Sequence, residues 1–133
     1  MASIFSKIIS GEILCHKIAE DDHFFAFLDI FPIAKGHTLV IPKQEVDYFF
    51  DLPAEILSNL MLFAQKLVPG IERACPCKKV GVAVIGLEVP HAHVHLVPLQ
   101  SVSDLNFERP KLTISHEELR EIASLRRNHL QRL

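Results

Sequence analysis

The chain has 133 residues, of which 49% are hydrophobic and 23% are charged, and its formal net charge is −2. This length suits one domain with a single core, expected to span residues 1–133. The near-neutral balance argues against polymeric nucleic acid as a partner. Because the sequence has no apolar run of about 18 residues, and its start lacks the apolar core of a signal peptide, we expect a cytoplasmic protein without membrane contact.

The first third of the chain predicts one short helix and three strands. Residues 3–13 carry apolar side chains at helical spacing, and Gly11 is expected to end that helix. Residues 14–21 and 24–30 are rich in apolar and aromatic residues and predict a hairpin. A turn containing Pro32 and Gly36 then leads into a third strand at residues 37–43.

A long amphipathic helix is predicted over residues 51–75, where apolar side chains recur at three- and four-residue spacing. Asp51 is its expected N-cap, and Pro53 is tolerated in its first turn. Pro69 and Gly70 are expected to kink or interrupt it, because proline removes one helical hydrogen bond.

The remaining elements complete an α+β domain. Residues 78–86 and 91–99 predict the fourth and fifth strands, and residues 112–130 predict a C-terminal helix with a capping-box signature at Ser115 and Glu118. We therefore expect a five-stranded, mostly antiparallel sheet, with the long helix packed on one face and short N-terminal and C-terminal helices in addition.

Three of the eight histidines lie at alternate positions in the segment HAHVHLV, residues 91–97, with apolar residues between them. Side chains alternate between the two faces of a strand. His91, His93 and His95 are therefore expected on one face, while the apolar residues are buried on the other. His37, at the start of the third strand, could be brought beside this row by strand pairing.

Three interpretations of this row are open from the residues alone. It can be a solvated sheet face, or it can bind a metal, since imidazole is the commonest nitrogen ligand of zinc. Three same-face positions span about 13 Å of strand, so they converge on one ion only with a bend. The third interpretation is phosphate chemistry, in which a neutral imidazole attacks phosphorus and its neighbours hold the phosphate oxygens. A separate zinc site at Cys75 and Cys77, spaced C-x-C, is less favoured than two reduced thiols in a turn.

The segment HAHVHLV resembles the motif that names the histidine triad (HIT) family of nucleotide hydrolases and transferases. The opening SIFSKIISGEI and the block AFLDIFPIAKGHTLVIPK are similar to further parts of that family, in the same order. The resemblance covers residues 3–98, which we take as the family core, and leaves residues 99–133 as an extension. It implies a five-stranded antiparallel sheet, a homodimer, and catalysis without metal or cofactor.

The resemblance also implies roles for particular residues. His93 would attack the α-phosphorus of a purine nucleotide conjugate, and water would then release the nucleoside monophosphate from the histidine. His91 and His95 would flank His93, orient its ring and contact the phosphate, and His37 matches the fourth histidine of the family. Asp29 matches the residue that binds the ribose hydroxyls, a task suited to a carboxylate, which accepts two hydrogen bonds at once. The apolar walls around the base would come from Phe5, Ile8, Phe27 and Ile30, for which an ordinary core position is an equal alternative.

The segment VGVAVIGLEVPHAH departs from the family pattern. Ile85 and Leu87 stand where many relatives carry an asparagine and a glutamine that contact the phosphate or the leaving group, and the loop is shorter. Glu88, the next position, is likewise expected at the nucleotide site, and its charge would repel a phosphate if it pointed into the site. We interpret these differences as a change in substrate preference.

The leading function is thus a HIT-type nucleoside phosphoramidase or nucleotide hydrolase. A nucleotide-binding regulatory module with weak catalysis and a metal-binding protein are the alternatives. The extension carries Arg109 and Lys111, which are expected in a solvated connector; the alternative is that either reaches a partner subunit's site.

Overall fold

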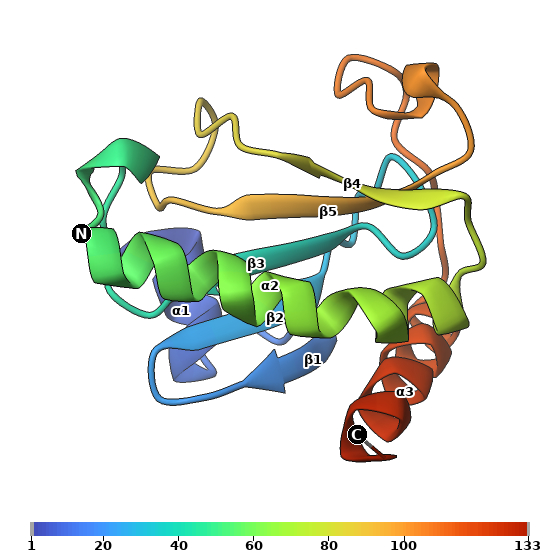
Figure 1. Cartoon of the computed structure of the whole chain (residues 1–133), viewed down its shortest axis with the longest axis horizontal. Coiled ribbons are helices and arrows are strands. Elements are labelled where there is room, and N and C mark those ends of the chain that lie inside the picture. Colours follow the sequence, from blue (N-terminus) through green and yellow to red (C-terminus); the bar gives the residue numbers. More distant parts are fainter. Residues whose placement is uncertain (1, 133) are drawn as a thin grey trace.

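The computed structural model describes residues 2–132, and the surroundings of side chains for residues 2–125. Five strands form one antiparallel sheet in the order β1-β2-β3-β5-β4 (Figure 1). Their bounds are Lys17–Glu20 for β1, Phe24–Leu28 for β2, Thr38–Pro42 for β3, Lys79–Ala83 for β4 and Val94–Leu99 for β5. The predicted α+β fold with a five-stranded antiparallel sheet is confirmed.

Alternation along the strands gives the sheet two apolar faces. One face, with Ala26, Val40 and Val94, packs against helix α2 (Ala54–Ala74) through residues such as Leu60 and Leu67. The other face is smaller, and its core consists of the side chains Phe5, Phe25, Phe27, Leu39 and Ile41. Figure 1 shows α2 in front of the sheet and the short helix α1 (Ile4–Ser10) behind it. A polar site on the α1 side can therefore rest on a sheet that α2 holds from the opposite side.

Strand β5 begins at Val94, so His91 and His93 precede the strand that was predicted to contain them. The N–H of Ala92 donates to Val46 O at 2.7 Å, in the loop after β3, and not to the β3 ladder. Ala92 is nevertheless buried in the same core cluster as Val94. The predicted alternation of faces therefore persists across residues 91–96, although the regular strand is shorter than predicted.

Helix α2 differs from its prediction at its start and near its end. Asp51 closes a short 3₁₀ helix (Phe49–Asp51), and Pro53 is the N-cap residue, so the prediction of Asp51 as N-cap is wrong. The helix also continues through Pro69 to Ala74 without interruption. One missing N–H bond costs less than exposing the buried stripe that follows it, which includes Ile71.

Helix α3 (His116–Arg132) packs against both α2 and β1. Its residues Leu119, Ile122 and Ala123 belong to the main core cluster, so the C-terminal extension is part of the core. At its start the N–H of Glu118 donates to Ser115 Oγ at 3.1 Å, which provides one of the two bonds of the predicted capping box.

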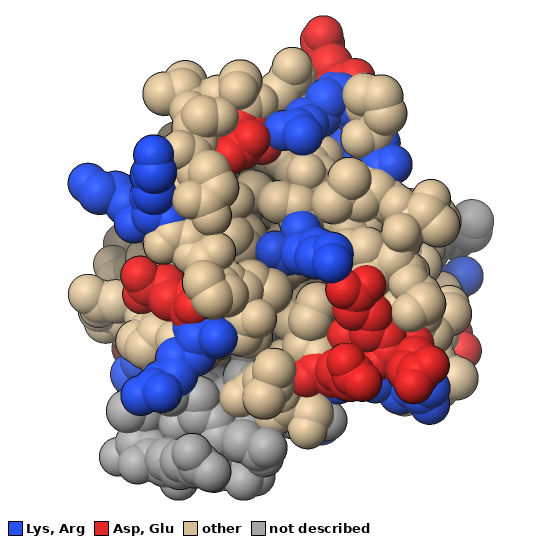
Figure 2. Space-filling view, turned by 90° about the vertical axis from the view of Figure 1, so that its right-hand side faces the viewer, with Lys and Arg blue, Asp and Glu red and all other residues tan. Residues whose placement is uncertain are grey.

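Within residues 2–132, no helix combines the length and the hydropathy that crossing a bilayer requires. On the face that Figure 2 shows, basic and acidic side chains lie in small neighbouring groups, without a continuous basic band.

Candidate active site

His93 lies immediately before β5 with its ring fixed by the backbone. His93 Nδ1 is 2.7 Å from His91 O. Because a carbonyl oxygen only accepts, Nδ1 carries the hydrogen and donates it, which leaves Nε2 with its lone pair. The Phe5 ring stands edge-on to the imidazole, with 4.9 Å between ring centroids. His93 is only 5% exposed, so one oriented imidazole presents an unprotonated nitrogen from a nearly dry position.

His91 is fully buried, and protein atoms lie within hydrogen-bond distance of both of its ring nitrogens. Nε2 donates to Pro42 O at 2.8 Å, and Nδ1 accepts from Ser3 Oγ, also at 2.8 Å. Ser3 is the N-cap of α1, and its hydroxyl also accepts the N–H of Ser6. In this structure both ring nitrogens of His91 therefore face protein atoms, and a contact of His91 with phosphate stays a prediction. The residue places the carbonyl that orients His93.

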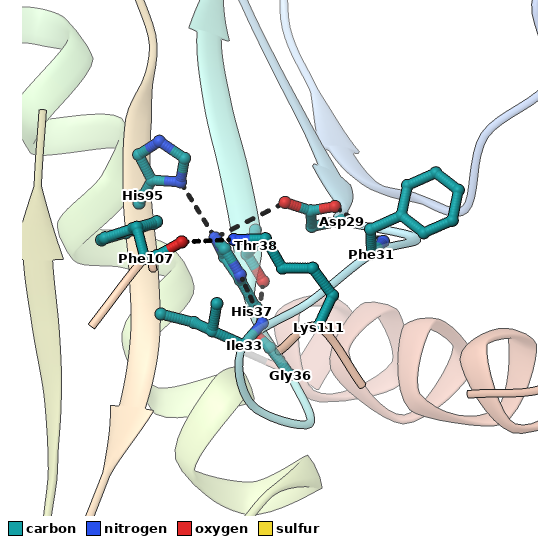
Figure 3. Close-up of polar contacts among 9 residues, drawn as sticks. All are labelled: Asp29, Phe31, Ile33, Gly36, His37, Thr38, His95, Phe107 and Lys111. Atoms are coloured by element: carbon teal, nitrogen blue, oxygen red, sulfur yellow. Dashed lines mark hydrogen bonds and ion pairs between the residues drawn. The ribbon is translucent and has the colours of Figure 1, made fainter. Parts of the chain in front are cut away.

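His37 and His95 form a directed hydrogen-bond chain (Figure 3). His37 Nδ1 accepts the backbone N–H of Ile33 at 3.2 Å, so the proton of neutral His37 is on Nε2. That N–H faces His95 Nδ1 at 2.9 Å, which in turn places the proton of His95 on Nε2. Pairing of β3 with β5 brings the two residues together, as the sequence predicted. The chain ends in a fixed donor, His95 Nε2–H, beside His93, with 4.9 Å between the two ring centroids.

Burial favours the neutral form of His93 and of His95. Burial lowers the pKa of His93 below its ordinary 6.5, although the hydrogen bond to His91 O and the charges of Asp29 and Glu88 act in the opposite direction. Burial lowers the pKa of His95 to about 3, with further contributions from His37, His93 and Lys111. At neutral pH both rings are therefore neutral, and each carries one ring proton, on Nδ1 in His93 and on Nε2 in His95.

Asp29 follows β2 at the edge of the same group of residues. Its Oδ1 accepts the N–H of Phe31 at 2.8 Å, and its Oδ2 lies 3.7 Å from His37 Nε2 (Figure 3). Burial raises the pKa of this carboxyl, whereas the Phe31 N–H and the positive charge of Lys111 lower it. Its side chain keeps 22% exposure, which leaves an acceptor accessible at the rim.

Of the four apolar residues predicted around a base, three lie in or against the core on the α1 side of the sheet, and one is exposed. Phe5 and Phe27 are buried with their ring centroids 5.6 Å apart, and Ile8 packs against the same cluster. Ile30 is 44% exposed and lies beside Asp29 in the sequence, outside that core. Phe5, which touches both His91 and His93, contributes to the site directly.

A cavity of about 350 Å³ opens beside His93. Ile85, one of the departures from the family pattern, lines it, whereas Leu87 is 88% exposed and Glu88 is also exposed. The opposite wall is the aromatic run Tyr48, Phe49 and Phe50, which sequence reasoning did not select. Three adjacent aromatic residues before a helix were the available signal, because Tyr48 and Phe50 are largely exposed and serve no core.

Among residues 2–125, whose side chains the structure describes, no group of three or more His, Cys, Asp or Glu residues is placed to hold a metal ion. This part of the chain contains the histidine row and the segment with Cys75 and Cys77. His37 and His95 are hydrogen-bonded to each other, and the rings of His91 and His93 are hydrogen-bonded to other protein atoms.

Comparison with known proteins decides the family. The model of the HIT domain matches residues 10–102. The chain belongs to the HIT family. A HIT-like protein of Methanocaldococcus jannaschii is 40% identical over 105 residues, which cover 71% of this chain and 77% of that protein. An adenosine 5′-monophosphoramidase of Saccharomyces cerevisiae is 38% identical over 98 residues, covering 73% of this chain and 62% of the enzyme.

Solved structures agree with this assignment. A HIT-like protein from Bartonella henselae superposes with a TM-score of 0.81 at 30% identity, covering 95% of each chain. Membership in the HIT family supports nucleotide hydrolase or transferase chemistry in general terms.

Proposed function

We propose that this HIT protein is a metal-independent hydrolase or nucleotidyl transferase of purine nucleoside phosphoramidates or related dinucleotide-type conjugates. The observation that carries the proposal is the fixed tautomer of His93, whose Nδ1–H is donated to His91 O and whose Nε2 is left as a nucleophile. Nε2 attacks the α-phosphorus, the bond from phosphorus to the leaving group breaks, and the leaving group takes up a proton. Water then attacks the phosphorus, cleaves the nucleotidyl-histidine bond and releases the nucleoside monophosphate.

The neighbouring residues receive complementary roles in this proposal. His95 Nε2–H donates to a non-bridging phosphate oxygen, and His37 keeps that proton on Nε2. Asp29 accepts hydrogen bonds from the ribose hydroxyls. Phe5 borders the base, together with Ile8, Phe27 and Ile30, and the aromatic cavity beside Ile85 takes the leaving group. The name of the yeast relative supports an adenosine phosphoramidate as the first substrate to test.

The test is AMP release from adenosine 5′-phosphoramidate, with and without EDTA, together with a brief pulse of labelled substrate quenched in alkali. We expect turnover that is insensitive to the chelator, and we expect the label to stay on the protein after the protein is denatured. Tight AMP binding without release would instead favour a binding module, and loss of activity with EDTA would favour a metal-dependent protein.

The same assay has an expected pH dependence. Attack requires neutral His93, and its pKa lies below 6.5 because burial disfavours the charged ring. The rate should therefore keep more than half of its plateau value at pH 6.5 and should reach its midpoint only below that pH. A midpoint at or above pH 6.5 would contradict the assignment of the neutral, buried His93 as nucleophile.

The proposal includes a homodimer formed through β4. This strand is an edge of the sheet, and its Val82 is 48% exposed, next to exposed Val84 and Ile85. An apolar edge strand invites pairing with a second strand. Light scattering after size exclusion should give the mass of two chains, and Val82→Lys should give the mass of one. A wild-type mass of a single chain at micromolar concentration would contradict the dimer.

A further inference from the structure

The segment after β5 returns across the histidine site, although it lies beyond residue 102, where the match to the HIT domain ends. The ring of Phe107 stands edge-on to His95, with 4.7 Å between ring centroids, and to His37, with 5.9 Å. Figure 3 shows Phe107 beside these two histidines. The site therefore has a wall contributed by the chain's own C-terminal extension, at a segment that the sequence predicted to be a solvated connector.

Hydrogen bonds fix both ends of this segment. Asp104 accepts the N–H groups of Gln100 and Ser101 at 2.8 and 2.9 Å, and its other oxygen lies 3.3 Å from Arg109 Nη1. At the far end, the N–H of Leu112 donates to Pro32 O at 2.8 Å, which ties the segment to the turn after Asp29. These hydrogen bonds therefore fix the position of the segment that carries Phe107.

Lys111 brings a positive charge to this wall. Its Nζ donates to Phe107 O at 3.0 Å and lies 5.6 Å from the centroid of the Phe107 ring. Figure 3 shows the side chain extending toward His37 and Asp29. Its positive charge lowers the pKa of Asp29 and the pKa of His95, the residues on either side of it. An ammonium group has three N–H donors, so the bond to Phe107 O leaves it able to donate to a ligand.

A nucleotide entering this site needs such a cation. His93 and His95 are neutral, while Asp29 and Glu88 place negative charge near His93. A phosphate group beside them would be repelled without a compensating charge. Resting on the proposed function, we infer that Lys111 is a specificity-determining residue that binds a phosphate oxygen of the nucleotide, held in position by its hydrogen bond to the backbone of Phe107.

The experiment compares the binding of AMP and of adenosine by calorimetry in full-length wild type, Lys111→Met and Lys111→Arg. Adenosine has the same base and ribose but no phosphate. We expect Lys111→Met to weaken AMP binding about tenfold or more, as for loss of a charge-assisted hydrogen bond, and to change adenosine binding by less than about twofold. Lys111→Arg should retain most of the AMP affinity, because it keeps the charge.

Lys66→Met is the matched control, because it removes one exposed lysine from α2 on the opposite face of the sheet. It should leave both affinities unchanged. Equal weakening of AMP and adenosine by Lys111→Met, or no weakening of either, would overturn this inference while leaving the proposed function intact. Failure of the wild type to bind AMP at all would overturn the proposed function, and this inference with it.

Discussion

Replacing His93 with alanine should lower kcat for adenosine 5′-phosphoramidate by about 10⁴-fold or more, because it removes the attacking atom itself. No other described ring can replace it in this position. Both nitrogens of His91 are bonded to protein atoms, and His95 Nδ1 is bonded to His37. The pulse-labelled nucleotidyl-protein should disappear together with the turnover.

The binding of AMP separates loss of chemistry from loss of the site. His93→Ala should still bind AMP within about tenfold of wild type, since Asp29, His95 and the apolar residues remain. His23→Ala, at an exposed histidine in the turn between β1 and β2, is the control and should keep full activity. Residual turnover above a few per cent in His93→Ala, with the label retained on the protein, would assign the nucleophile to another residue.

The sequence was sufficient for the parts of this molecule that depend on local periodicity. Apolar side chains at alternate or helical spacing predicted all five strands and the three α-helices, because burial of one face follows directly from that spacing. The buried alternation through Ala92 and Val94 likewise placed the histidines on the face opposite α2. The N-cap of α2 at Pro53 was not predictable in this way, since Asp51, the expected cap, belongs to the 3₁₀ helix Phe49–Asp51.

The contacts that define the site are between residues far apart in the chain, which a motif cannot reveal. Ser3 and His91 are 88 positions apart, and His37 and His95 are 58 positions apart. The motif indicated a nucleophile, His93, between two flanking histidines, whereas the structure shows the hydrogen-bond partners that distinguish the three rings. His91 is enclosed, His93 has an available nitrogen, and His95 is a donor set by His37. The wall made by Phe107 is likewise a tertiary contact, with no signal in its own sequence segment.

These hydrogen-bond partners predict that His91 matters most for stability among the three histidines of the motif. His91→Ala should lower the free energy of unfolding by about 3 to 4 kcal/mol, measured by urea denaturation. The change empties a fully buried position and leaves Pro42 O and Ser3 Oγ without their partner. It also frees the backbone whose carbonyl orients His93, so kcat should fall even at temperatures where the variant is folded.

Ser3→Ala separates the loss of one hydrogen bond to His91 from the loss of the whole His91 ring. It removes one of the two bonds to the His91 ring and the N-cap of α1, but it keeps the imidazole and its bond to Pro42 O. Its expected cost is about 1 to 2 kcal/mol, below that of His91→Ala. His23→Ala, at an exposed position, should change stability by no more than about 0.5 kcal/mol. If His91→Ala were as mild as His23→Ala, the ring would not be the buried support that these contacts describe, and the orientation of His93 would have to come from the backbone of the loop alone.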